Sequence, residues 1–239
     1  MRALASDLPI QFERASVHAG AVTILDRIEL TVAAGVPTVL IGPNGSGKTT
    51  LLRLAMGMVA PSRGRVSWGG AESPPTRRAF MFQRPVMLRR STIGNLRYAL
   101  GAAGVSRTAR DARATELLSL VGLSTLGARP ARRLSSGEQQ RLALARALAR
   151  EPAVLFLDEP SASLDPAATK AVEDVIRAIT ARSIKVVIAT HDLGQARRLA
   201  GEVVLLHRGR VIESAPAEQF FSNPKTIEAR RFVAGELLV

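Results

Sequence analysis

Four short runs of consecutive apolar residues stand out along the chain, at positions 38–41 (TVLI), 154–157 (VLFL), 186–189 (VVIA) and 203–206 (VVLL). Each run is followed by glycine or by a polar residue. Apolar runs of this length predict strands buried on both faces, and helical stretches between them favour a parallel sheet covered by helices. Ligand sites of such sheets lie beyond the carboxyl ends of the strands, so the residue that follows each run is a candidate for function.

The stretch 93–150 has no comparable apolar run, and its pattern predicts helices at 106–121 and 138–150. The pair Glu151-Pro152 is expected to end the second helix, because proline disfavours helical backbone in the residue before it. At the other end of the chain, residues 1–31 are expected to form additional β structure.

The length of 239 residues, with 46% apolar and 22% charged residues, fits one large domain or a core that carries an insertion. We therefore expect a single domain over residues 1–239, with an α/β core formed by 1–87 and 151–239 and a helical subdomain at 88–150. Cysteine is absent, which excludes disulfides, thiolate metal sites and a cysteine nucleophile, and this fits a reducing cytosol.

Basic residues outnumber acidic ones by 33 to 20, which leaves a formal charge of +13. This excess favours an anionic partner such as nucleic acid, a phosphorylated ligand or a membrane surface, but an arginine-rich composition on solvated faces explains it equally well. With 4% aromatic residues, the chain lacks the pattern of a single-strand nucleic-acid platform. No apolar run approaches the ~20 residues needed to cross a bilayer, so we expect a soluble, cytosolic chain.

A glycine-rich segment directly follows the run at 38–41 and precedes a helical pattern. Its sequence, GPNGSGKTT, fits the phosphate-loop pattern G-x-x-x-x-G-K-[ST]. Glycines let successive backbone N–H groups point inward, and the following helix adds its positive N-terminal end. In this position Lys48 would bridge the β and γ phosphates of a nucleotide, and the hydroxyl of Thr49 would bind Mg²⁺. A glycine turn that merely connects strand to helix would leave Lys48 and Thr49 unexplained.

Acidic residues follow the run at 154–157, and a histidine follows the run at 186–189 after one threonine. Downstream of a phosphate loop, Asp158 is placed to hold the magnesium ion or its water. Glu159 projects to a different side and can align or deprotonate an attacking water. His191 could donate a hydrogen bond to a γ-phosphate, although a lone histidine at a strand end is more often structural.

A second candidate anion site begins at Ser135, where Ser135 and Glu138 fit a capping box at the start of a helix. A capped helix explains the serine and the glutamate, but it gives no purpose to Gly137, because glycine in a first helical turn lowers stability. A serine-glycine helix N-terminus can bind an anion. Two phosphate-binding elements in one chain would be redundant unless two chains share nucleotides across an interface.

With these motifs in this order, the chain resembles the ATP-binding subunits of ABC transporters over nearly its whole length. The motifs and their counterparts are 42–50 for Walker A, Gln83 for the Q-loop, 134–139 (LSSGEQ) for the signature, 154–159 for Walker B, 161–165 (SASLD) for the D-loop and His191 for the switch histidine. The resemblance implies an α/β P-loop NTPase (RecA-like) core with an N-terminal β-subdomain and an inserted α-helical subdomain.

The resemblance also implies a homodimer in which two ATP molecules lie between Walker A of one subunit and the signature of the other. In this sequence the nucleotide-binding residues would be His18, Gly42, Pro43, Asn44, Gly45, Ser46, Gly47, Lys48, Thr49, Thr50, Ser135, Ser136, Gly137, Glu138 and Asp165. Magnesium would be held by Thr49, Gln83 and Asp158, and the catalytic residues would be Glu159, His191 and Gln83.

The chain departs from the family pattern in two places. Its signature has Ser136 where glycine is commonest and Glu138 where glutamine is commonest, which are known variants, and we expect activity to survive. An aromatic residue that stacks on adenine in the family is replaced by His18, whose ring offers less stacking surface.

The family resemblance implies a transporter whose membrane pathway is a separate permease, contacted through residues 84–92. Residues 83–98 are similar to importers of tungstate and related oxyanions, and 220–237 are similar to importers of tungstate, phosphate and polar amino acids. We expect import of tungstate or molybdate, with phosphate or a polar amino acid as the alternative. A solute-binding protein would act indirectly, and the chain would lie peripherally on the cytoplasmic face of the inner membrane.

A soluble ABC ATPase acting on nucleic acid or a cytosolic assembly is the competing interpretation. Members that act in DNA repair interrupt the core with long coiled coils, whereas Leu134 lies only 86 positions after Lys48. Translation-related members carry two ATPase cassettes, and this chain has one. We therefore expect no nucleic-acid partner.

Overall fold

The computed structural model describes residues 7–72, 77–236 and 238. The described residues form two compact units, of which unit 1 lies within 1–76 and 185–239, and unit 2 lies within 77–184. Among the residues that the structure describes, none of the helices combines the length and the apolar character that crossing a membrane requires.

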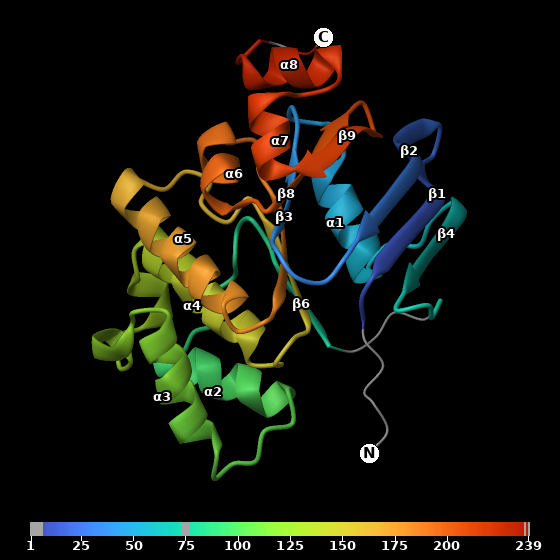
Figure 1. Ribbon diagram of the computed structural model, residues 1–239. Helices are drawn as coiled ribbons and strands as arrows, with labels where there is room; N and C mark the ends of the chain where they lie inside the picture. The colour runs from blue at the N-terminus through green and yellow to red at the C-terminus, as the bar shows by residue number, and fades with distance from the viewer. Residues whose placement is uncertain (1–6, 73–76, 237, 239) are drawn as a thin grey trace. The chain divides into compact units, whose positions relative to one another are not determined.

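Unit 1 begins with a three-stranded antiparallel sheet in the order β2-β1-β4 (Figure 1). Its strands are β1 (Ile10–Ala19), β2 (Val22–Val32) and β4 (Arg63–Trp68). The β structure expected over residues 1–31 is therefore confirmed from Ile10 onward, whereas residues 1–6 lie outside the described part of the chain. The polar strand β4 carries no continuous apolar run, and the sequence pattern did not predict it.

The second sheet of unit 1 contains β7 (Lys185–Ala189), β3 (Thr38–Ile41), β8 (Glu202–His207) and β9 (Arg210–Pro216), in that order. Strand β3 pairs in parallel with β7 and β8, as the apolar runs predict. Strand β9 pairs antiparallel with β8, so this sheet is not entirely parallel. The two-residue turn at 208–209 explains the reversal, because both residues have positive φ (49° and 75°), as a tight hairpin turn requires.

In the described part of unit 1, the helices that accompany these sheets are α1 (Lys48–Met56), α6 (Leu193–Leu199), α7 (Ala217–Ser222) and α8 (Ile227–Val233). Strand β4 is attached to α1 by Trp68, which is 6% exposed and whose indole Nε1 donates to the carbonyl of Ala55 at 2.7 Å.

Helix α8 is anchored to β9 by the buried carboxylate of Glu213. That carboxylate accepts hydrogen bonds from the backbone N–H groups of Lys225 and Thr226 and from the hydroxyl of Thr226, at 2.8 to 2.9 Å. Burial raises the pKa of Glu213, but these hydrogen bonds outweigh burial and lower it overall.

Unit 2 contains a parallel pair of strands, β5 (Arg78–Met81) and β6 (Val154–Asp158). Its helices are α2 (Thr92–Ala102), α3 (Arg110–Leu120), α4 (Ser136–Leu148) and α5 (Pro166–Thr180), with short 3₁₀ turns η1 (Ser124–Leu126) and η2 (Ala131–Arg133). The helices predicted at 106–121 and 138–150 are thus confirmed as α3 and α4. Helix α4 starts two residues earlier than predicted because Ser135 caps it.

The boundary between the compact units differs in position from the boundary that we drew between an α/β core and a helical subdomain. Strands β5 and β6 and helix α5, which we assigned to the core, cluster with α2, α3 and α4 in unit 2. The assignment of residues 88–150 to a separate helical subdomain stays a prediction.

Candidate functional site

The glycine-rich segment connects β3 to α1 in unit 1, with Asn44 and Gly45 exposed and Lys48 as the first residue of the helix. Gly42 has φ +147°, and a Cβ on it would lie 2.0 Å from the carbonyl oxygen of Leu206. Gly47 has φ +103°, and a Cβ on it would lie 2.8 Å from Leu25. Only glycine fits at these two positions, because the chain passes between β2 and β8 in a backbone conformation that side chains rarely adopt.

Two polar side chains of the loop are buried within it. Lys48 is 7% exposed, and its Nζ donates to the carbonyls of Gly42 at 2.8 Å and Pro43 at 3.0 Å. The hydroxyl of Ser46 is buried and has no hydrogen-bond partner among the described residues. A buried hydroxyl without a partner is costly, so a ligand oxygen that bonds to Ser46 would remove that cost. The loop therefore has the donors that a phosphate group needs.

The loop is braced from the β8–β9 turn and from β2. The N–H of Gly209 donates to the carbonyl of Ser46 at 3.0 Å, and the N–H of Asp26 donates to the carbonyl of Gly209 at 2.8 Å. The carboxylate of Asp26 also accepts from Nε (2.9 Å) and Nη2 (2.6 Å) of Arg210, and these hydrogen bonds lower the pKa of Asp26. Segments far apart in the sequence thus fix the loop geometry.

His191 lies at the same sheet edge as the phosphate loop. Strands β3 and β7 are parallel neighbours with Leu40 opposite Ala189, and the N–H of Thr190 donates to the carbonyl of Leu40 at 3.0 Å. The loop leaves β3 and His191 leaves β7 at their carboxyl ends, so unit 1 places them together as the sequence pattern led us to expect. The next residue, Asp192, caps α6 by accepting from the N–H groups of Gly194 and Gln195.

His18 lies on β1 opposite Thr23 of β2, in the three-stranded sheet of unit 1. Its Nδ1 is 3.1 Å from the hydroxyl of Thr23, and its backbone N–H donates to the hydroxyl of Ser62 at 3.1 Å. The residues after Thr23 form the wall against Gly47, because a Cβ on that glycine would meet Ile24 and Leu25. His18 therefore belongs to the hairpin that borders the phosphate loop.

In unit 2, Gln83 and the acidic pair lie at the carboxyl ends of the parallel neighbours β5 and β6. Strand β5 ends two residues before Gln83, β6 ends at Asp158, and the register sets Met81 opposite Leu157. Asp158 is 5% exposed and Glu159 is half-buried. Glu159 has φ +49°, which is uncommon for a residue with a side chain, and backbone of this kind is concentrated at functional sites.

The segment 135–138 forms the capped start of α4, and the predicted capping box is confirmed. The hydroxyl of Ser135 accepts from the N–H of Glu138 at 3.3 Å, and the carboxylate of Glu138 accepts from the N–H of Ser135 at 2.7 Å. Ser135 and Ser136 are exposed, whereas Gly137 is buried. A Cβ on Gly137 would lie 2.7 Å from the Cβ of Ala168 on α5. The glycine therefore has a packing role that the sequence pattern did not indicate.

Asp165 has a defined role within this chain as the N-cap of α5. Its Oδ1 accepts from the N–H of Ala168 at 2.9 Å, and Pro166 follows at the first helical position. This cap is compatible with the nucleotide contact implied by the resemblance, which stays a prediction.

A hollow within unit 2 brings together three of the segments singled out from the sequence. It is lined by Gln83, Arg84, Pro85, Ser136, Gln139, Gln140, Ala162, Ser163 and Leu164. In this hollow, Nε2 of Gln140 donates to the backbone carbonyl of Gln83 at 2.9 Å. The sequence did not indicate this contact, because a glutamine on a helix gives no signal that its partner is the carbonyl of a distant loop.

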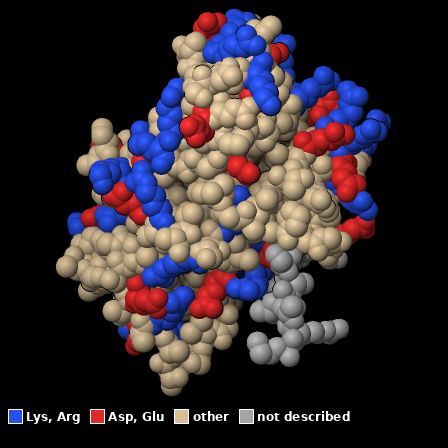
Figure 2. Space-filling view, in the orientation of Figure 1, with Lys and Arg blue, Asp and Glu red and all other residues tan. Residues whose placement is uncertain are grey.

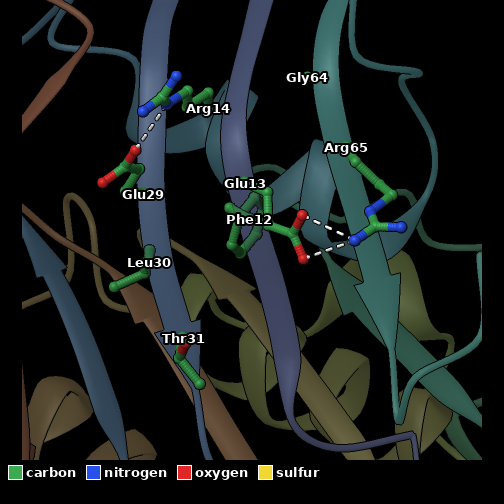
Figure 3. Close-up of a pocket in the computed structure, with 8 residues that line it drawn as sticks. All are labelled: Phe12, Glu13, Arg14, Glu29, Leu30, Thr31, Gly64 and Arg65. Carbon is green, nitrogen blue, oxygen red and sulfur yellow. Dashed lines mark hydrogen bonds and ion pairs between the residues drawn. The ribbon is translucent and has the colours of Figure 1, made fainter.

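Another hollow lies on the three-stranded sheet (Figure 3). It is lined by Phe12, Glu13, Arg14, Glu29, Leu30, Thr31, Gly64 and Arg65. Its charged side chains pair with one another across the strands, with Arg14 Nε 3.2 Å from Glu29 and Arg65 Nη2 2.8 Å from Glu13. Because these charges balance, this hollow does not offer the excess of donors found at the phosphate loop.

The basic residues behind the charge of +13 do not form one continuous stripe on the face shown in Figure 2, where acidic side chains lie among them. The geometry of unit 1 instead defines a P-loop nucleotide-binding protein, because a glycine-rich loop with a buried lysine joins a strand of a largely parallel sheet to a helix.

Comparison with known proteins agrees with this class. Residues 25–162 match the sequence family described as ABC transporter. In structure, the chain is similar to cbiO1 from Clostridium perfringens, part of the ABC transporter complex cbiONQ, with a TM-score of 0.83 and 25% identity over 95% of both chains. The chain belongs to the ABC transporter ATP-binding family, with its P-loop NTPase fold, and is an ATPase.

Curated relatives cover nearly the whole chain. The tungstate uptake system ATP-binding protein TupC of Peptoclostridium acidaminophilum is 40% identical over 84% of this chain and 94% of its own length. The taurine import ATP-binding protein TauB of Pseudomonas putida is 38% identical over 94% and 93%. The phosphate import ATP-binding protein PstB 2 of Natronomonas pharaonis is 36% identical over 90% and 82%.

Proposed function

We propose that this chain is the ATPase subunit of an importer for a tungstate-type oxyanion, and that it works as a homodimer beside separate permease subunits. The observation that carries the ATPase chemistry is the phosphate loop, where Lys48 is held by loop carbonyls and the hydroxyl of Ser46 is buried without a partner among the described residues. The importer class follows from the relatives, which are named as uptake or import ATP-binding proteins.

Magnesium fits the donor types that the chain offers. Mg²⁺ prefers oxygen ligands and is usually held by one or two protein groups together with substrate phosphates and water. Thr49 offers a hydroxyl, Asp158 a carboxylate and Gln83 an amide oxygen, and the described residues contain no cluster of three or more His, Cys, Asp or Glu side chains. The bound ion would neutralise charge on the phosphates.

The reacting groups in this proposal are Glu159 and His191. Glu159 aligns or deprotonates the attacking water, and it follows the buried Asp158 in a left-handed backbone conformation. His191 donates to the γ-phosphate from the edge where the phosphate loop begins. Gln83 contacts the magnesium ion through its amide oxygen. His18 stacks on adenine beside the loop.

Dimerisation supplies the second phosphate contact. The exposed Ser135 and Ser136 stand at the N-terminus of α4, where backbone N–H groups and the helix dipole favour an anion. In a head-to-tail pair, this terminus of one subunit faces the phosphate loop of the other. A catalytic site completed only at the interface couples hydrolysis to movement of the subunits.

The permease contact is assigned to residues 84–92, on the cytoplasmic face of the membrane. Val86 is 74% exposed, and Tyr98, which lies beyond this segment on α2, is 53% exposed; arginines are close to both in the sequence. Between residues 83 and 98 the chain has arginines but no acidic residue. An apolar surface with a basic surround suits a protein partner that brings apolar and acidic side chains.

The solute is assigned from the relatives, because an ATPase subunit makes no contact with it. Tungstate is placed first since TupC is the most identical of the relatives described, and molybdate is its chemical neighbour. Phosphate or a polar amino acid is the alternative, and PstB 2 among the relatives supports phosphate. A solute-binding protein would deliver the solute to the permease.

Uptake in cells tests this proposal. The gene that encodes the chain is deleted from its natural host. Accumulation of tungstate, molybdate and phosphate is then measured in the deleted strain, with and without a copy of the gene supplied again. We expect tungstate uptake to fall on deletion and to return with the unmodified chain but not with Glu159→Gln, which should bind ATP without hydrolysing it. Normal tungstate uptake with lost phosphate uptake would select the alternative. Normal uptake of all three would contradict the oxyanion proposal.

A further inference from the structure

The loop at residues 83–88, here the Gln83 loop, has neither helical nor strand hydrogen bonding. Three of its backbone carbonyls accept hydrogen bonds from side chains instead. The donors and distances are Gln140 Nε2 to the oxygen of Gln83 at 2.9 Å, Arg146 Nη1 to that of Val86 at 2.6 Å and Arg132 Nε to that of Met87 at 3.2 Å. The loop backbone is therefore fixed by long side chains from elsewhere in unit 2.

All three donors come from one place in the fold. Gln140 and Arg146 lie on α4, and Arg132 lies on η2, which directly precedes α4. The capped segment 135–138 stands between Arg132 and Gln140 along the chain. A displacement of η2 and α4 would therefore pull on the Gln83 loop through these hydrogen bonds.

Two of the donors, Gln140 and Arg146, are withdrawn from solvent, whereas Arg132 is exposed. Gln140 is 5% exposed, and its Oε1 has no hydrogen-bond partner among the described residues. Arg146 is half-buried, and loss of hydration lowers the pKa of its guanidinium. Burying these groups is unfavourable unless the hydrogen bonds that they make are maintained.

The same loop keeps its side chains available while its backbone is held. Val86 is 74% exposed although its carbonyl is bound to Arg146, and Gln83 is exposed although its carbonyl is bound to Gln140. The amide of Gln83 can thus meet a ligand while the backbone behind it stays attached to α4.

We propose that Gln140, Arg146 and Arg132 are positioning residues that make the location of Gln83 follow helix α4. When α4 moves, Gln83 and the exposed Val86 move together with it. Because Gln83 contacts magnesium in the proposed function, this positioning role rests on that function.

Hydrogen exchange and steady-state kinetics on the purified full chain test the role together. Gln140→Glu keeps the side-chain shape but replaces the donor with a carboxylate oxygen, and Arg146→Met keeps much of the length but removes the donor. We expect amide exchange in residues 83–90 to rise at least about tenfold and kcat to fall about tenfold, because small misplacements of a catalytic group are costly. KM for ATP should stay within about twofold, because the loss falls on the transition state.

Two matched variants separate positioning from general damage. Arg146→Lys retains an N–H donor and should recover part of kcat and of the exchange protection. Arg150→Met alters an exposed arginine one turn further along and should behave like the unmodified chain. Circular dichroism checks that each variant is folded.

Unchanged exchange in both Gln140→Glu and Arg146→Met would overturn the proposal. Faster exchange with normal kcat would overturn it as well, provided that Gln83→Ala lowers kcat. Normal kcat in Gln83→Ala would instead refute the catalytic role of Gln83 in the proposed function, and the exchange result would still decide whether the side chains hold the loop.

Discussion

Replacing Gly137 by alanine tests why the first turn of α4 contains a glycine. The missing side chain would point at α5, because a Cβ on Gly137 would lie 2.7 Å from the Cβ and 3.6 Å from the Cα of Ala168. Ordinary contacts of such carbon atoms are about 3.5–4.0 Å, so the two helices would have to separate. If packing is the reason for the glycine, enlarging it should harm stability first and hydrolysis as a consequence.

The size of the effect follows from two opposing contributions. Overpacking of this kind costs about 1–3 kcal/mol. Exchanging glycine for alanine in a helix recovers about 0.5–1 kcal/mol. The net loss for Gly137→Ala is therefore about 1 kcal/mol, with about 2.5 kcal/mol as the upper expectation. Each kcal/mol lowers Tm by about 2–4 °C in a chain of this size.

A second substitution, Ala168→Gly, removes the Cβ atom with which a side chain at position 137 would collide. Ala168→Gly alone should cost about 0.5–1 kcal/mol, because it places glycine in the first turn of α5. In the double variant the overpacking disappears and the two helix contributions nearly cancel, so its stability should be close to that of the unmodified chain. The coupling free energy from the four proteins should be about 1–3 kcal/mol, measured by urea unfolding followed by circular dichroism.

Hydrolysis by the same four proteins distinguishes packing from nucleotide approach. Since the missing Cβ faces α5, we expect the double variant to recover ATP hydrolysis together with stability. Low hydrolysis in a stable double variant would show that the glycine is needed where a phosphate comes close. A Gly137→Ala protein as stable as the original, with no coupling to Ala168, would refute the packing argument.

Three further predictions concern other parts of the chain. Glu213→Gln should lower the free energy of unfolding at pH 7 by about 1.5–3 kcal/mol, the usual contribution of hydrogen bonds to a charged group. Because the folded-state pKa of Glu213 is lowered, the difference in stability from the unmodified chain should shrink as the pH falls below about 4.3. An equal difference at pH 7 and pH 3.5 in urea unfolding would contradict this prediction. Mixing Ser136→Arg with Lys48→Ala subunits should restore hydrolysis that neither variant has alone, at no more than one site per dimer, and absence of recovery would argue against sharing. Arg89→Glu with Arg90→Glu should abolish the stimulation of hydrolysis by the permease and leave basal hydrolysis unchanged, so normal stimulation would exclude these residues from the contact.

The buried strands were predictable because their residues are apolar on both faces. In β3, β6 and β7 every position is buried, and each strand contains one of the apolar runs, although Asp158 ends β6 and Lys185 begins β7. The apolar pattern did not indicate β4 or β9, because both strands contain exposed positions and charged residues. Their pairing depends on partners elsewhere in the chain, which a local pattern does not contain.

The candidate site divides in the same way between local and distant causes. The phosphate loop and the capping box are encoded within a few residues, and both were identified from their spacing. The reason for Gly137 lies in Ala168, and the reason for Gln140 lies in the carbonyl of Gln83, 57 positions away. No sequence rule links such residues, because their partners are brought together only by the packing of helices.

The attachment of Trp68 to α1 has a practical consequence. Trp68 is the one tryptophan of the chain, and its indole is bonded to the carbonyl near the end of the helix that begins at Lys48. Its emission is therefore a built-in optical reporter for unit 1, whereas unit 2 contributes no tryptophan signal. Comparing fluorescence with circular dichroism during one denaturation would reveal whether the two units melt together or in sequence, with no label added.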